Sequence, residues 1–165
     1  MIFVTVGTHE QGMDRLLIEI DKLIENKKIT EKVFAQIGYC TYTPKNYKYK
    51  KMIGYDEMDS YIKKSRIIIT HGGPGSIFHP IQYSKIPIVV PRNPRFNEHV
   101  DDHQILFAKR LESQNKIIAV YDICDLGNIL NNYEKLASEI NIKHTEKENF
   151  ILRFDKRIKE KFKLY

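Results

Sequence analysis

Residues 70–76 of this 165-residue chain read Thr-His-Gly-Gly-Pro-Gly-Ser and directly follow three isoleucines at 67–69. A short β-branched run that ends in a glycine cluster is typical of a buried parallel strand followed by a tight loop. The pattern at 77–84 then predicts a helix. Glycines let the backbone approach a ligand, and the free N–H groups of a helix N-terminus attract anions. This segment therefore predicts a phosphate-binding loop, with a purely structural strand-to-helix turn as the alternative.

Two further polar segments follow predicted strands. Residues 7–10, Gly-Thr-His-Glu, come after a strand expected at 2–6, and residues 91–104, PRNPRFNEHVDDHQ, come after one expected at 86–90. In open parallel sheets, ligands bind outside the carboxyl ends of the strands. We therefore expect the three polar segments to meet at one edge of the sheet and to bind a phosphorylated small molecule, most plainly a nucleotide.

The elements that must position these segments alternate between strand and helix patterns. Further strands are expected at 33–37, 52–53, 66–70 and 117–120, and helices at 11–25 and 56–64, the second capped by Asp56. The polar stretch 39–51 predicts a loop. Such alternation builds a parallel sheet with helices on both faces. The sequence thus predicts an α/β, single Rossmann-like domain of five or six parallel strands over residues 1–145.

Composition fits one globular domain, since 42% of the residues are hydrophobic and 29% are charged. No apolar run is long enough to cross a membrane, and the N-terminus lacks the pattern of a secretion signal, so a cytoplasmic protein is expected. Cys40 and Cys124 lie far apart and form no metal-binding or redox motif, which fits a reducing compartment.

Four segments together resemble the C-terminal, nucleotide-sugar-binding domain of GT-B glycosyltransferases. They are FVTVGTHEQGMDRL at 3–16, ITHGGPGSI at 69–77, PIVVPR at 87–92 and FNEHVDDHQ at 96–104. The likeness is greatest to family 28 C-terminal-domain proteins that form separate small chains. These include the catalytic subunits of bacterial capsule or exopolysaccharide transferases and of the eukaryotic dolichol-pyrophosphate GlcNAc transferase.

The resemblance implies a subunit that transfers a hexose or N-acetylhexosamine from a UDP-sugar to a lipid-linked saccharide, with inversion. No metal or other cofactor is implied, because N–H donors stabilise the leaving diphosphate. The residues implied to bind the nucleotide sugar are Gly7, Thr8, His71, Gly72, Gly73, Gly75, Ser76, Arg92, Glu98, Asp102, His103 and Gln104. His9 and Glu10 are the candidates for the general base, unless His9 is an ordinary loop residue or the base lies on a partner.

One position departs from the family pattern. His79 stands where many relatives carry a glutamate that is thought to hold the ribose hydroxyls. The ribose contact must then come from another residue, for which Glu98 is a candidate, or be weaker.

A GT-B enzyme has two Rossmann-like halves, and this chain has room for one. The resemblance therefore implies a membrane-anchored partner that binds the acceptor and holds this chain at the inner face of the cell membrane. Residues 143–165 carry eight Lys/Arg against four Asp/Glu, and Phe150, Phe154, Ile158 and Phe162 recur at helical spacing. Residues 146–165 thus predict a basic amphipathic helix that covers the domain's own core or docks on a partner or membrane.

Other interpretations stay open. The chain could be a non-catalytic nucleotide-binding or scaffold subunit of a glycosyltransferase complex, whereas the absence of Gly-x-Gly-x-x-Gly and Gly-x-Ser-x-Gly argues against a dehydrogenase and a serine hydrolase. His99 and His103 have metal-ligand spacing but no evident third ligand. Arg92 and Arg95 either clamp phosphate or face solvent. The Lys/Tyr stretch 45–51 is more typical of a solvated loop than of a nucleic-acid surface, so no nucleic-acid partner is expected.

Overall fold

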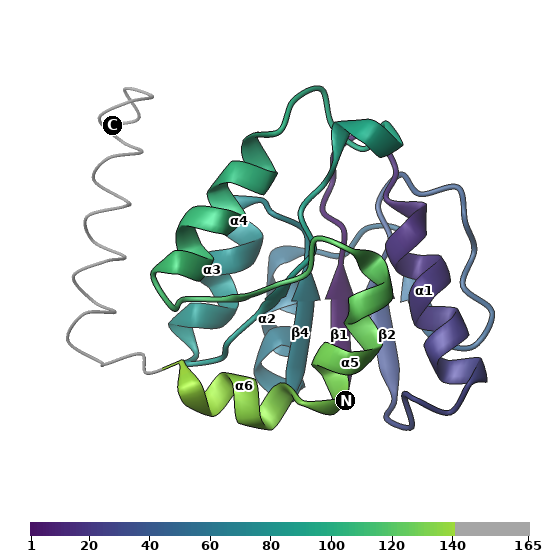
Figure 1. The fold of residues 1–165 in the computed structure, drawn as a ribbon. Coiled ribbons are helices and arrows are strands. Elements are labelled where there is room, and N and C mark those ends of the chain that lie inside the picture. Colours follow the sequence, from purple (N-terminus) through teal and green to yellow (C-terminus); the bar gives the residue numbers. More distant parts are fainter. Residues whose placement is uncertain (141–165) are drawn as a thin grey trace.

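The computed structural model describes residues 1–140, and six parallel strands form the centre of this part of the chain (Figure 1). The strands are β1 (Ile2–Thr5), β2 (Val33–Gln36), β3 (Lys48–Lys50), β4 (Ile67–Thr70), β5 (Ile88–Val89) and β6 (Ile118–Ala119). Their order in the sheet is β3-β2-β1-β4-β5-β6, and every neighbouring pair is parallel. From β1, the chain first adds strands on one side, β2 and β3, and then on the other, β4, β5 and β6. The strand order therefore reverses between β1 and β4, and open α/β sheets bind ligands at such a switch point.

Helices cover both faces of this sheet (Figure 1). They are α1 (Asp14–Glu25), α2 (Tyr55–Lys64), α3 (Pro74–Gln82), α4 (His103–Ser113), α5 (Leu126–Asn131) and α6 (Tyr133–Glu139), with 3-10 turns η1 (Pro94–Phe96) and η2 (Ile123–Asp125). Helices α1, α5 and α6 pack in one hydrophobic cluster, and α2, α3 and α4 pack in two others. The predicted α/β Rossmann-like fold, with a parallel sheet between two helical layers, is confirmed.

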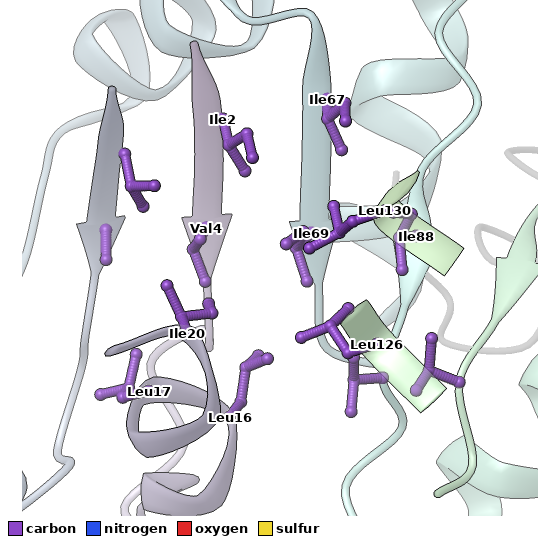
Figure 2. Packing of buried hydrophobic residues seen from close by; sticks show 14 of the residues in the cluster. Ile2, Val4, Leu16, Leu17, Ile20, Ile67, Ile69, Ile88, Leu126 and Leu130 are labelled. Atoms are coloured by element: carbon purple, nitrogen blue, oxygen red, sulfur yellow. The ribbon is translucent and has the colours of Figure 1, made fainter. Parts of the chain in front are cut away.

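The strands other than β3 are buried, and because successive side chains point to opposite sides, both of their faces pack against helices. Ile2 and Val4 of β1 and Ile69 of β4 pack against the α1 side, as Figure 2 shows. Phe3 and Ile68, one residue away in each strand, pack against α2. Helix α1 completes the first cluster with Leu16, Leu17 and Ile20. Burying each such side chain contributes about 1.5–3 kcal/mol, so this core fixes where β1 and β4 end.

Four details differ from the sequence prediction. Strand β3 lies inside the stretch 39–51 that was expected to be a loop, and residues 52–53 form no strand. All three residues of β3 are exposed, so this edge strand has no hydrophobic pattern. Helix α2 has Gly54 at its N-cap and no side-chain cap, so the expected Asp56 cap was wrong. Helix α3 begins three residues earlier than expected, at Pro74, whose fixed φ suits the first helical position.

The C-terminal helix predicted at 146–165, and the boundary placed at residue 145, lie outside the described residues. Among residues 1–140, no helix combines the length and the apolar character that a membrane span requires.

Candidate functional site

Three loops follow the carboxyl ends of the central strands. The first loop, residues 6–13, joins β1 to α1; the second, residues 71–73, joins β4 to α3; the third, residues 90–102, joins β5 to α4. We call the three loops and the first turns of α3 and α4 the rim. Hydrogen bonds and close packing between the loops, described below, place them together at the point where the strand order reverses.

The imidazole of His71 lies between the first two loops. A Cβ atom added at Gly7 or at Gly73 would fall well inside van der Waals contact with this ring. Gly7 also has a left-handed backbone conformation, with φ of +76°. Gly73 has an ordinary φ of −73°, so only its closeness to His71 requires glycine there. These two glycines therefore make room for a histidine of the chain itself.

His71 is hydrogen-bonded at both ring nitrogens. Its Nδ1 accepts from the backbone N–H of Gly73 at 3.0 Å, and its Nε2 lies 3.0 Å from the hydroxyl oxygen of Ser76. Burial, followed by the positive charge of Arg92, lowers the pKa of His71 to about 4. The ring is therefore neutral at neutral pH, and its contacts tie the second loop to the first turn of α3.

Arg92 holds the first and third loops together from inside the protein. Its side chain is 1% exposed, and its guanidinium donates to the carbonyl of Val6 at 2.7 Å, to that of Glu98 at 2.9 Å, and to that of Gln11. The sequence left open whether Arg92 clamps phosphate or faces solvent. The structure places it in neither position, because its described hydrogen bonds all go to loop carbonyls.

Glu98 is also engaged within the protein. Its carboxylate is buried and accepts from the guanidinium of Arg15 at 2.8 and 3.0 Å and from the backbone N–H of Asn93 at 3.0 Å. Arg15 donates further to the carbonyl of Pro91. Both oxygens of Glu98 are thus occupied, and this placement does not favour the ribose contact expected for it.

Gln104, in the first turn of α4, connects the second and third loops. Its amide oxygen accepts from the backbone N–H of Arg92 at 3.2 Å. A Cβ atom at Gly72 would lie only 2.8 Å from the Cβ of Gln104, so Gly72 allows the two segments to touch. Gln104 therefore serves the structure of the rim whether or not it contacts a sugar.

Asp102 and His103 stand exposed at the start of α4. The ring of His103 is 80% exposed and lies 2.9 Å from the carboxylate of Asp101, which also lies 2.9 Å from the ring of His99. Across residues 1–140, no group of three or more His, Cys, Asp or Glu side chains is arranged to hold a metal ion. Asp102 and His103 are thus available to a ligand, and Asp101 orients the two histidines.

The two candidate bases differ in their surroundings. His9 accepts the backbone N–H of Gln11 at its Nδ1, at 3.2 Å, and its ring centroid lies 4.9 Å from that of His99. Burial and the charge of Arg92 lower the pKa of His9, so the ring is neutral with its proton on Nε2. In this arrangement the lone pair of Nδ1 is used within the first loop. Glu10, like Thr8, is exposed at the rim.

The open part of the rim is the N-terminus of α3. Gly73 caps this helix without a side-chain hydrogen bond, and a Cβ atom at Gly75 would meet nothing within 4 Å. The first N–H groups of a helix have no partner within the helix. The backbone of Gly75 and the hydroxyl of Ser76 are therefore the donors of the glycine loop that remain accessible to an anion.

Some residues that build the rim were missed from the sequence, above all Arg15 and Asp101. Arg15 lies in a helix pattern, and its partner Glu98 is 83 positions away, so no local spacing relates the two. Asp101 lies between His99 and His103 in the sequence. This spacing could have indicated a carboxylate that both histidines share.

An open parallel sheet with a glycine loop and a free helix N-terminus at its switch point defines the Rossmann-like class of anion-binding domains. A sequence model of the glycosyltransferase family 28 C-terminal domain matches residues 1–162. The chain therefore belongs to this family and is a glycosyltransferase donor-binding domain. The comparison with curated proteins gave no match.

The low pKa of His71 predicts how folding stability depends on pH. The pKa is about 4 in the folded protein against 6.5 for an unperturbed histidine, so the unfolded chain binds the proton more tightly. Stability is therefore complete above about pH 6.5 and falls as the pH decreases toward 4. Between pH 7 and 4.5, the free energy of unfolding should decrease by about 2–3 kcal/mol more in the natural protein than in His71→Asn.

Urea titrations at the two pH values measure this difference. His103→Asn is the control, because that ring is exposed and makes none of the hydrogen bonds of His71. An unchanged pH dependence in His71→Asn would contradict the buried neutral state of His71.

The glycine contacts predict opposite results for two alanine variants. Gly73→Ala places a methyl group against the His71 ring and should lower the free energy of unfolding by about 1–3 kcal/mol. Gly75→Ala adds the same group in open space within a helix and should leave stability unchanged or slightly higher. Thermal unfolding of the two variants compares their stabilities. Equal stabilities would show that the His71 ring does not need the space at Gly73.

Proposed function

We propose that this domain is the catalytic, donor-binding subunit of an inverting glycosyltransferase and that its donor is a UDP-hexose or UDP-N-acetylhexosamine. The open N-terminus of α3 carries the proposal. The accessible backbone of Gly75 and the hydroxyl of Ser76 provide donors for a diphosphate at the switch point of the sheet. Membership of family 28 supplies the glycosyl-transfer chemistry.

In this proposal, the charge that develops on the leaving UDP is stabilised by preorganised N–H and O–H donors, without a required metal ion. Thr8, Glu10, Asp102 and His103 surround the same rim and are exposed, so they are the proposed contacts for the sugar and the acceptor. On this chain, the exposed Glu10 is the proposed general base. The alternative is a base supplied by a partner subunit.

We further propose that a second chain covers the rim. Exposed apolar side chains lie on the loops that follow β2, β3 and β5 and at the start of α2: Tyr39, Met52, Tyr55, Phe96 and Val100. Apolar residues gathered around a polar site are typical of interaction surfaces. The proposed partner is a membrane-anchored Rossmann-like subunit that binds a lipid-diphosphate-linked saccharide for capsule or exopolysaccharide synthesis. It would hold this chain at the inner face of the cell membrane.

Calorimetry with UDP in the presence of EDTA tests donor binding. The natural chain should bind UDP, and Gly75→Val should lower the affinity at least about tenfold, because its side chain fills the space in front of the α3 N-terminus. The fold should be kept, since a Cβ atom at this position meets nothing within 4 Å. Ser113→Val, at the far end of α4, is the control and should bind normally. Binding that appears only with Mg²⁺ or Mn²⁺ would contradict the metal-free proposal.

Reconstitution tests catalysis and the partner together. The purified chain, the membranes of the source organism, and their mixture are assayed for transfer of labelled sugar from a panel of UDP-sugars to lipid. Transfer should require the mixture, because in this proposal the acceptor-binding half belongs to the partner. Full transfer by the chain alone would refute the two-chain arrangement. UDP binding without transfer in any mixture would favour a non-catalytic nucleotide-binding or scaffold subunit, which the occupied Nδ1 of His9 also fits.

A further inference from the structure

The hydrogen bonds of His71 determine where its proton lies. A backbone N–H donates and cannot accept, so the Nδ1 atom that accepts from Gly73 carries no proton. The neutral ring must then carry its proton on Nε2. Because Nε2 lies 3.0 Å from the Ser76 hydroxyl, the ring donates to that oxygen.

This arrangement fixes the role of the Ser76 hydroxyl. Its oxygen accepts from His71, and its own hydrogen has no acceptor among residues 1–140. Ser76 is partly exposed and directly follows Gly75, beside which the space is open. The hydroxyl hydrogen is therefore free to be donated to an anion at the N-terminus of α3.

We propose that His71 is a positioning residue that keeps the Ser76 hydroxyl as a donor to the diphosphate of the bound nucleotide, and that it does so without touching the ligand. This inference rests on the proposed function, because it concerns the same UDP site. Both nitrogens of the ring are used within the protein, which leaves none for a phosphate oxygen.

The surroundings of the ring hold it in this state. Gly7 and Gly73 both lie so close to the ring that a Cβ atom at either position would clash with it, and this packing restricts the movement of the ring. Arg92, His9, His99 and the Gln104 amide face the ring. A protonated ring would carry hydrogens on both nitrogens, and one of them would oppose the N–H of Gly73. Burial and the positive charge of Arg92 keep the pKa of His71 low and so prevent this.

A double-mutant cycle on UDP affinity, measured by calorimetry in EDTA, tests the coupling. Ser76→Ala should lower the affinity about tenfold, which is the size of one lost charge-assisted hydrogen bond. In His71→Asn, the amide oxygen of the new side chain stands near the Nδ1 position and still accepts from the N–H of Gly73. The donor to Ser76 is lost, so the affinity for UDP should fall about three- to tenfold. The double variant should bind no more weakly than Ser76→Ala alone.

Two further variants separate positioning from structure. His71→Gln places an amide N–H near the Nε2 position and should bind more tightly than His71→Asn. Ser76→Thr keeps the hydroxyl and should retain most of the affinity. If His71→Asn does not fold, the protonation of the imidazole in the natural protein carries the test. Imidazole nitrogen shifts of the natural protein, measured by NMR, should show the proton on Nε2.

The outcomes are distinct. A natural chain that does not bind UDP overturns the proposed function and this inference with it. Normal UDP binding, combined with additive losses in the cycle, overturns the inference alone. A proton found on Nδ1 does the same, because Nε2 could then not donate to Ser76.

Discussion

The rim depends on one buried charge, the guanidinium of Arg92. It donates to carbonyls that belong to the first and third loops, and its own backbone N–H is held by Gln104 from α4. A buried cation without an anionic partner in direct contact is costly, so these carbonyl dipoles must remain in place for the protein to fold. Burial, and after it this same charge, lowers the pKa values of His9 and His71, so the Arg92 side chain contributes both to the shape of the rim and to the neutral state of these two rings.

The general architecture could be predicted because it follows from patterns within single segments. The isoleucines of β4 and the apolar run of β1 are buried on both faces, and their hydrophobicity identifies them as central strands. Strand β3 could not be identified in this way, because its three residues are exposed and its place depends on pairing with β2.

The candidate site was predictable as a place but not as a set of contacts. Parallel strands bring their carboxyl ends to one edge, so the polar loops had to meet there. What each residue does at that edge depends on partners far away in the sequence. Glu98, which could have met a ribose, is bound to Arg15, and Gly73, which could have met a phosphate, makes room for His71. Only the start of α3 keeps the openness that the glycine pattern suggested.

Strand β3 bears on how copies of this domain behave in concentrated solution. It is the outer strand of the sheet on that side, only three residues long, with Lys48 and Lys50 exposed. Short, lysine-bearing edges resist the addition of a strand from another molecule, because pairing would bring like charges together. This edge of the sheet is therefore a poor template for a strand from another copy of the domain.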